Sequence, residues 1–213
     1  MSSALAPQQR RSRETQARLL QATIEMLEKH GLDGATIPRI AAAAGIAPAT
    51  VYRRFRDRDA LFRAAFMDVL EKSAAANQAL RIESFKNATF EGVAFELVGA
   101  LIKQYRTYPG LLRAFMRFTE NDSDEAFRAK AIAIVSANFK RIGDLLYTFR
   151  AEIAHRNPKR AILFGLLSVG TNIEVKALEE LSMWNFMFPI SDSELQKEST
   201  RSLLAYLRSP NLR

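Results

Sequence analysis

Residues 36–55 read TIPRIAAAAGIAPATVYRRF. Ile40 and Ala44 recur at the spacing of one helical face, and the alanines around them are small enough to let a second helix approach closely. Gly45 follows and favours a tight turn. A second short helix is expected over about 48–55. Two short helices joined by a glycine turn are typical of a helix-turn-helix.

The second of these helices has one apolar face and one cationic face. Ile46, Val51 and Phe55 are expected to point inward. The outward residues are then Pro48, Ala49, Tyr52, Arg53 and Arg56. Small side chains at the front let such a helix enter a DNA major groove, which is about 12 Å wide, while hydroxyls and guanidiniums hold the phosphates. The alternative is a hairpin that only packs, with solvated arginines. The coincidence of small-residue helix, turn glycine, Tyr-x-x-Phe and arginines favours DNA binding.

Helices are also predicted on both sides of this motif. A first helix over about 13–30 carries the apolar stripe Ala17, Leu20, Ile24 and Leu27, and Gly31 ends it. Thr36 is the expected N-cap of the next helix, with Pro38 in its first turn. Asp57 is placed to cap a long fourth helix.

Beyond residue 76 the pattern indicates longer helices, near 86–106, 109–119, 124–155, 158–183 and 192–208. No alternating stretch is long enough for a sheet, so the fold class is all-α. We expect three parts: a flexible basic arm over 1–12, a helix-turn-helix domain over 13–60, and a helical effector-binding and dimerisation domain over 61–213.

Charge favours a polyanionic partner. Lys plus Arg number 31 against 23 Asp plus Glu, which gives a net charge of +8. Residues 1–66 contain 11 basic and 6 acidic side chains, and 67–213 contain 20 and 17, so the first third has most of the excess. The chain has no cysteine, no secretory leader pattern and no run of 18 apolar residues. We therefore expect a cytoplasmic protein without a membrane partner.

Enzyme chemistry finds no support in the sequence. The two histidines, His30 and His155, lie far apart and at expected helix ends. No metalloprotease motif, nucleophile elbow, phosphate loop or paired carboxylates occur. We expect no catalytic residue, no metal and no cofactor.

Residues 13 to about 70 resemble the N-terminal domain of the TetR family of bacterial transcriptional regulators. The residues that carry the resemblance are Ile40-Ala41, Ala44-Gly45-Ile46, Thr50-Val51-Tyr52, Phe55 and Arg58-Asp59-Ala60-Leu61. The resemblance implies a homodimeric repressor that binds a double-stranded DNA operator of palindromic sequence. It also implies that the C-terminal helices bind a small-molecule inducer.

The resemblance also implies roles for single residues. Phosphate contacts are expected from Thr36, Thr50, Tyr52 and Arg58, with Arg39 and Arg54 as supplements, and base-edge contacts from Pro38, Pro48, Ala49 and Arg53. Ala47 stands where the family has a capping Ser or Thr, Arg58 where it has Lys, and Arg54 where it often has His. Tyr52 has an alternative as a core aromatic. Arg10, Arg11 and Arg13 either touch the minor groove or form a solvated tail.

The helical body has many aromatic residues, most of which are expected to be core. A largely apolar effector is expected to contact Tyr105, Phe115, Phe118, Phe139, Asn172 and Trp184. The apolar stretch 182–189 either covers a ligand cavity or packs on a partner subunit. The dimer surface is expected from 158–183 and 192–208, with Leu195, Leu203, Leu204 and Leu207 as core or interface residues. The competing function is an architectural or nucleoid-type DNA-binding protein without an effector.

Overall fold

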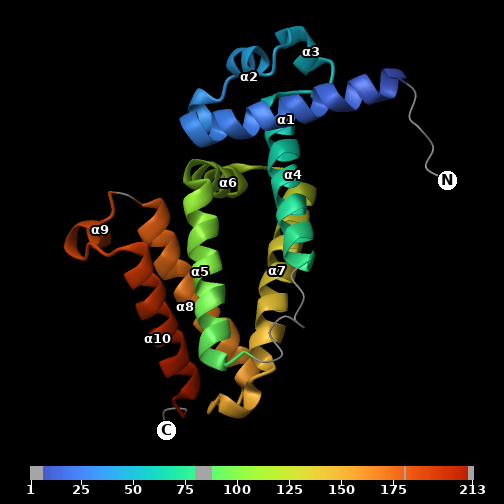
Figure 1. The fold of residues 1–213 in the computed structure, drawn as a ribbon. Helices are drawn as coiled ribbons and strands as arrows, with labels where there is room; N and C mark the ends of the chain where they lie inside the picture. Colours follow the sequence, from blue (N-terminus) through green and yellow to red (C-terminus); the bar gives the residue numbers. More distant parts are fainter. Residues whose placement is uncertain (1–6, 80–87, 180, 211–213) are drawn as a thin grey trace, which may run out of the picture. The chain divides into compact units, whose positions relative to one another are not determined.

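The structure, a computed structural model, describes residues 7–79, 88–179 and 181–210. Within these residues every regular element is helical and no strand occurs, so the all-α prediction is confirmed. The elements are α1 (Pro7–Gly34), α2 (Ile37–Ala43), α3 (Pro48–Tyr52), α4 (Arg58–Ala79), α5 (Phe90–Thr107), α6 (Pro109–Asn121), α7 (Glu125–Tyr147), the 3₁₀ turn η2 (Arg150–Glu152), α8 (Pro158–Leu178), α9 (Met183–Met187) and α10 (Asp192–Arg208) (Figure 1).

The chain forms two compact units. Unit 1 consists of the residues up to Ser73 together with Gly110–Ile132, and unit 2 of Ala74–Pro109 together with the residues from Ala133 on. Helices α4 and α7 each begin in unit 1 and end in unit 2. The boundary expected after residue 60 falls inside unit 1, because Leu61 and Phe62 belong to the core of that unit.

Helix α1 begins at Pro7, earlier than the expected start at residue 13. The described part of the expected arm is therefore helical, while residues 1–6 lie outside the described residues. The polar residues there form helix readily but show no apolar period, which is why the pattern misses them. At Gly31 the backbone leaves helical geometry, with φ 63° and ψ −169°, as the glycine predicts.

The buried face of α1 is rotated from the expected stripe. Ala17 is exposed and Leu20 is half-buried, whereas Leu19 and Thr23 are fully buried. The Thr23 hydroxyl donates a hydrogen bond to the Leu19 carbonyl oxygen at 2.7 Å, so its burial leaves no polar group unsatisfied. A threonine at a core position breaks the apolar pattern, and this explains the error.

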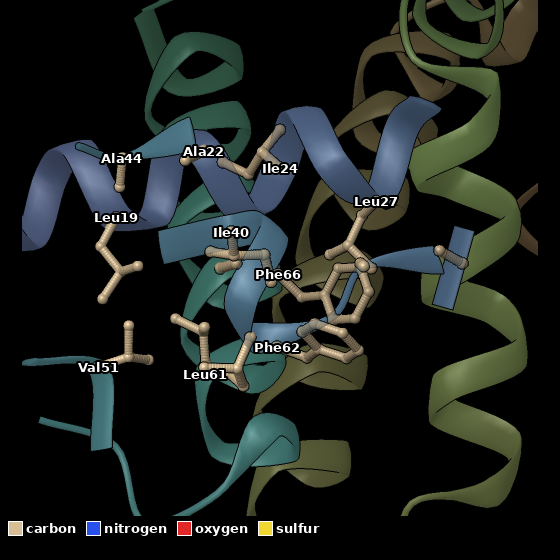
Figure 2. Packing of buried hydrophobic residues seen from close by; sticks show 14 of the residues in the cluster. Leu19, Ala22, Ile24, Leu27, Ile40, Ala44, Val51, Leu61, Phe62 and Phe66 are labelled. Atoms are coloured by element: carbon tan, nitrogen blue, oxygen red, sulfur yellow. The ribbon is translucent and has the colours of Figure 1, made fainter. Parts of the chain in front are cut away.

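Unit 1 has a single core built from the N-terminal helices, α6 and the start of α7. Figure 2 shows side chains of α1, α2, α3 and α4 converging on it. Phe62 and Phe118 meet edge to face with ring centroids 6.0 Å apart, and Phe66 lies 5.4 Å from Phe118. Such aromatic pairs stabilise a core beyond the area they bury.

A buried ion pair joins α4 to the turn between α6 and α7. The Arg63 guanidinium donates to both carboxylate oxygens of Asp122, with Nε to Oδ2 at 2.7 Å. The Asp122 side chain is only 3% exposed. Asp124 caps α7 through the Phe127 amide at 2.9 Å, so the start of α7 follows the sequence prediction closely.

Unit 2 is a bundle in which α5, α8 and α10 pack on one another (Figure 1). Its buried core includes Phe90, Leu146, Ile162 and Ile173. The four α10 leucines for which core and interface remained open all belong to this core, namely Leu195, Leu203, Leu204 and Leu207.

Two helices end earlier than expected. Helix α7 ends at Tyr147 rather than near residue 155, and Phe149 beyond it stacks on Phe90 with centroids 5.2 Å apart. Helix α8 ends at Leu178 rather than 183, and just beyond its end the side-chain Nδ2 of Asn185 donates to the Glu179 carbonyl oxygen at 2.8 Å. The end of α7 depends on the contact of Phe149 with Phe90, which is distant in sequence, and the end of α8 on a side-chain bond from Asn185. Helical periodicity records neither.

Helix α8 is long and apolar enough, by length and composition, to cross a membrane, with mean hydropathy 1.4 over its most apolar window. The expectation that no segment could qualify was therefore too strict, because it required an unbroken apolar run. The window is 44% buried inside the protein, where α8 packs against α5 and α10.

Candidate nucleic-acid interface

The turn between α2 and α3 is fixed by Gly45. Its φ is +64°, a left-handed conformation that glycine adopts without penalty. The Gly45 amide donates to the Ala42 carbonyl at 3.1 Å and the Ile46 amide to the Ala41 carbonyl at 3.0 Å. This pair of bonds is the Schellman arrangement, which satisfies the last carbonyls of a helix. The glycine thereby sets the direction in which α3 leaves.

Helix α3 is held from one side. Val51 is buried, and Ile46 and Phe55 pack partly buried against the same core, as their spacing predicts. Pro48 occupies the first turn, and Ala47 at the N-cap provides no side-chain hydrogen bond. Because the inward side is occupied by Val51, the opposite side of this short helix faces solvent.

The solvent side of α3 presents small residues and a tyrosine. Pro48, Ala49, Tyr52 and Arg53 are all exposed. Tyr52 is 58% exposed. The alternative in which Tyr52 is a core aromatic is therefore wrong. Thr50 is half-buried, and its hydroxyl accepts a hydrogen bond from the Arg53 guanidinium at 2.9 Å.

Arginines surround this face. Arg54 donates to the Ser12 hydroxyl at 3.2 Å, which ties the end of α3 to α1. The guanidinium of Arg58 lies 5.3 Å from the Phe62 ring centroid and pairs with Asp59 at 3.6 Å. Arg56, which the site prediction omitted, is the most exposed of them, with a side chain 92% exposed. Its place in the basic run 53–58 is the signal that identifies it.

Helix α2 contributes the remaining expected residues. Thr36 stands at the N-cap position, but its side chain makes no capping bond, and only its carbonyl accepts the Ile40 amide at 2.9 Å. Pro38 and Arg39 are exposed, and Arg39 donates to the Gly34 carbonyl at 3.4 Å. Asp57 caps α4 through the Ala60 amide at 2.7 Å, as expected. The capping bond engages the carboxylate of Asp57, which is the one acidic residue in the basic run 53–58.

The residues expected to bind an effector are divided between the two units. Phe115 and Phe118 pack in the core of unit 1, whereas Tyr105 and Phe139 pack against the core of unit 2. Asn172 and Trp184 line a pocket between α8, α9 and α10. The Tyr105 hydroxyl donates to Glu174 at 3.4 Å, and burial together with that carboxylate raises the pKa of Tyr105 to about 12.

Within the described part of the chain, no group of three or more His, Asp or Glu side chains is arranged to hold a metal ion. His155 contacts the Tyr206 carbonyl oxygen at 2.8 Å through Nε2 and lies against the Tyr206 ring.

The helix-turn-helix region matches a known family. Residues 19–65 match the family model described as bacterial regulatory proteins, tetR family. An HTH-type transcriptional regulator of Mycobacterium tuberculosis is 40% identical over 62 residues, which are 29% of this chain and 30% of that protein. The Escherichia coli regulator BetI is 22% identical over 145 residues, 67% of this chain and 72% of BetI. The match over residues 19–65 and the likeness to these regulators support the TetR family for this chain.

Solved TetR-family structures share the fold beyond the matched segment. A TetR regulator from Haloarcula marismortui superposes with a TM-score of 0.65 at 18% identity, over 92% of this chain and 97% of that one. FadR of Bacillus subtilis, solved in complex with stearoyl-CoA, gives 0.60 at 15% identity, over 90% and 97%. The aligned part of the mycobacterial relatives spans under a third of their length, so the likeness in sequence is concentrated in the TetR DNA-binding domain.

Proposed function

We propose that this chain is a transcriptional regulator, a repressor that binds a palindromic DNA operator as a homodimer and is released by a small, mainly apolar effector. The proposal assigns the protein to the cytoplasm, and gives it no catalytic role, metal or cofactor. The observation that carries it is the exposed side of α3, where Ala49, Tyr52 and Arg53 project from a helix anchored by buried Val51.

The chemistry of that surface supports duplex DNA as the partner. Small residues at the front of α3 allow close approach to base edges, and Arg53 can donate two hydrogen bonds to a guanine. Thr36, Thr50, Tyr52 and Arg58 are proposed as phosphate contacts, with Arg39, Arg54 and the exposed Arg56 in support. Pro38, Ala47, Pro48 and Ala49 are proposed to lie at the groove, where they limit which bases fit.

Dimerisation is proposed because one short recognition helix reads too few base pairs for a unique site in a genome. Helix α8 offers a surface for it. Leu163, Phe164 and Leu167 are all more than half exposed and lie within one turn of each other. Large apolar side chains gathered on one helix face are typical of a protein interface.

Effector binding is proposed from the family and from unit 2. FadR of Bacillus subtilis, whose structure contains stearoyl-CoA, has a similar fold, and this supports the proposal. Here Asn172 and Trp184 line a pocket. Tyr105 and Phe139, which pack against the core of unit 2, remain proposed effector contacts. Phe115 and Phe118, which lie on α6 in unit 1, remain proposed contacts as well. The effector must bind one conformation better than the other, since only that difference shifts the equilibrium.

An architectural DNA-binding protein without an effector is the alternative. Its cationic surface would hold phosphates alone, and its binding would show little sequence preference. The net charge of +8 is compatible with either function.

The test is selection of bound duplexes from a random library by the full chain, followed by footprinting on genomic DNA. The proposal expects a palindromic consensus with half-sites about 34–36 Å apart, one helical turn. Enrichment of no consensus, with binding that depends only on salt, would favour the architectural alternative.

A further inference from the structure

A pocket of about 600 Å³ opens between α8, α9 and α10, entirely within unit 2. Its size lies in the range of small-molecule sites, about 300–1,000 Å³. Val175, Trp184 and Phe188 contribute apolar surface, and Ser202 lines the α10 side. The pocket therefore suits a ligand that is largely apolar.

One cation stands in the pocket wall. The Lys176 ammonium donates to the carbonyl oxygen of Trp184 at 3.0 Å and to that of Phe188, and lies 5.3 Å from the centroid of the Phe188 ring. An ammonium has three N–H donors. Two are taken by these carbonyls, so one remains for another acceptor.

The charge of Lys176 is not neutralised by the protein residues that the structure describes. Glu198 also lines the pocket, but it pairs with Arg201 at 3.3 Å. None of the ion pairs among the described residues includes Lys176. Since carbonyls solvate a cation without cancelling its charge, the pocket wall retains a positive charge beside an apolar surface.

We propose that this pocket binds an amphipathic carboxylate. Its apolar body lies against Trp184 and Phe188, and one carboxylate oxygen accepts the third N–H of Lys176. The inference deepens the effector-binding part of the proposed function and rests on that proposal for any effect on DNA.

The same contacts link the ligand to helix α9. No residue of α9 is buried. The helix is attached to α8 by the two Lys176 bonds and by the Asn185 amide, which donates to Glu179. A ligand carboxylate that accepts a hydrogen bond from Lys176 therefore contacts the same ammonium that attaches α9 to α8.

The test uses decanoate and decan-1-ol as a matched pair of probes on the full chain without DNA. Trp184, the one tryptophan of the chain, reports binding through its fluorescence. We expect decanoate to bind about tenfold more tightly than the alcohol, the effect of one charge-assisted hydrogen bond. Equal affinities, or no saturable change in emission, would overturn the proposal.

Variants separate the cation from the pocket. Lys176→Met should remove the preference for the acid, Lys176→Arg should retain it, and Ser202→Phe should abolish binding of both probes by filling the pocket. Lys103→Met, an exposed lysine of α5 outside the pocket, is the matched control and should behave as the parent chain. If Lys176→Met alone shifts the ligand-free Trp184 emission, α9 has moved, and the Lys176→Arg and Ser202→Phe results decide.

Three further outcomes separate the fate of this inference from that of the proposed function. Emission that depends on protein concentration but not on decanoate would show that a second copy fills the pocket, which overturns the inference. Sequence-specific DNA binding without decanoate binding would overturn the pocket inference and leave the proposed repressor function standing. Decanoate binding without sequence-specific DNA binding would leave the pocket inference standing and refute the proposed repressor function.

Discussion

Arg53 and Arg58 lie in different surroundings, and this predicts different roles on DNA. Arg53 is exposed at the end of α3 and donates to the Thr50 hydroxyl, whereas Arg58 opens α4 beside Asp59 and the Phe62 ring. We expect Arg58→Ala to weaken binding to all sequences alike and to lower the salt slope by about one unit. Arg53→Ala should instead relax the preference at one operator position by about 1–3 kcal/mol.

Fluorescence anisotropy at several salt concentrations, on operator and mutated duplexes, measures both effects. Lys72→Ala is the control, because Lys72 lies about 21 Å along α4 from Arg58. If both arginine variants lose affinity uniformly, the division between base and phosphate contacts is refuted.

The buried pair of Arg63 and Asp122 predicts a pH-dependent stability. Its hydrogen bonds hold the pKa of Asp122 below the ordinary value, so the stabilisation is present above about pH 3.9, the unfolded pKa, and is lost as pH falls through the folded pKa. Asp122→Asn should lower the free energy of unfolding by about 1.5–3 kcal/mol at pH 7, and the loss should shrink below pH 4.

Urea unfolding of the parent chain and of Asp122→Asn, at pH 7 and at a pH below 4, measures this difference in the free energy of unfolding. The matched control is Glu71→Gln, which breaks the exposed pair of Glu71 on α4 and Lys130 on α7, at 2.7 Å. Glu71→Gln should change the free energy of unfolding by less than about 1 kcal/mol at either pH. A loss for Asp122→Asn that is the same at both pH values would contradict the linkage.

At the scale of elements, the turn at Gly45 predicts the effect of adding one methyl group. A Cβ at Gly45 meets nothing within 4 Å, so any penalty of Gly45→Ala comes from φ +64° alone. We expect a loss of about 1–2 kcal/mol. Gly143→Ala in the helix interior of α7, where the Cβ meets Ile162 at an ordinary 3.8 Å, should stabilise by up to about 1 kcal/mol.

Thermal unfolding followed by circular dichroism compares the two alanine variants. Gly45→Ala should also weaken DNA binding, since α3 leaves the turn in a direction that Gly45 fixes. Equal stability of the two variants would show that the turn tolerates a side chain and does not constrain α3.

The helices differ in how well their starts and ends can be predicted from the local sequence. Gly45, Asp57 and Asp124 act locally, so the turn and two helix starts were predictable to within a residue or two. The end of α8 was not, because the Asn185 side-chain bond to the Glu179 carbonyl is not part of any helical period. Aromatic residues at helical spacing look alike whether they fill a core or line a pocket, which is why Phe118 was grouped with Trp184.

At the scale of the whole molecule, the exposed α8 residues predict the oligomeric state. Leu167→Glu should convert a dimer into a monomer in light scattering. Operator affinity should fall toward the non-specific level, about a thousandfold or more. Ile132→Glu is the matched control, because Ile132 and Leu167 are 65% and 63% exposed. A Leu167→Glu chain that remains dimeric would place the interface elsewhere.

The division into units has a consequence for the order of synthesis. Unit 1 is not contiguous, since its core needs Phe118 and Phe127 as well as Phe62 and Phe66. At about 5–20 residues per second, a ribosome adds the missing aromatics roughly 3–11 s after Ser73. During that interval the aromatic faces of α4 lack their partners. The nascent DNA-binding domain therefore exposes aromatic surface until unit 2 is partly made, and we expect a fragment cut after Ser73 to remain in that state.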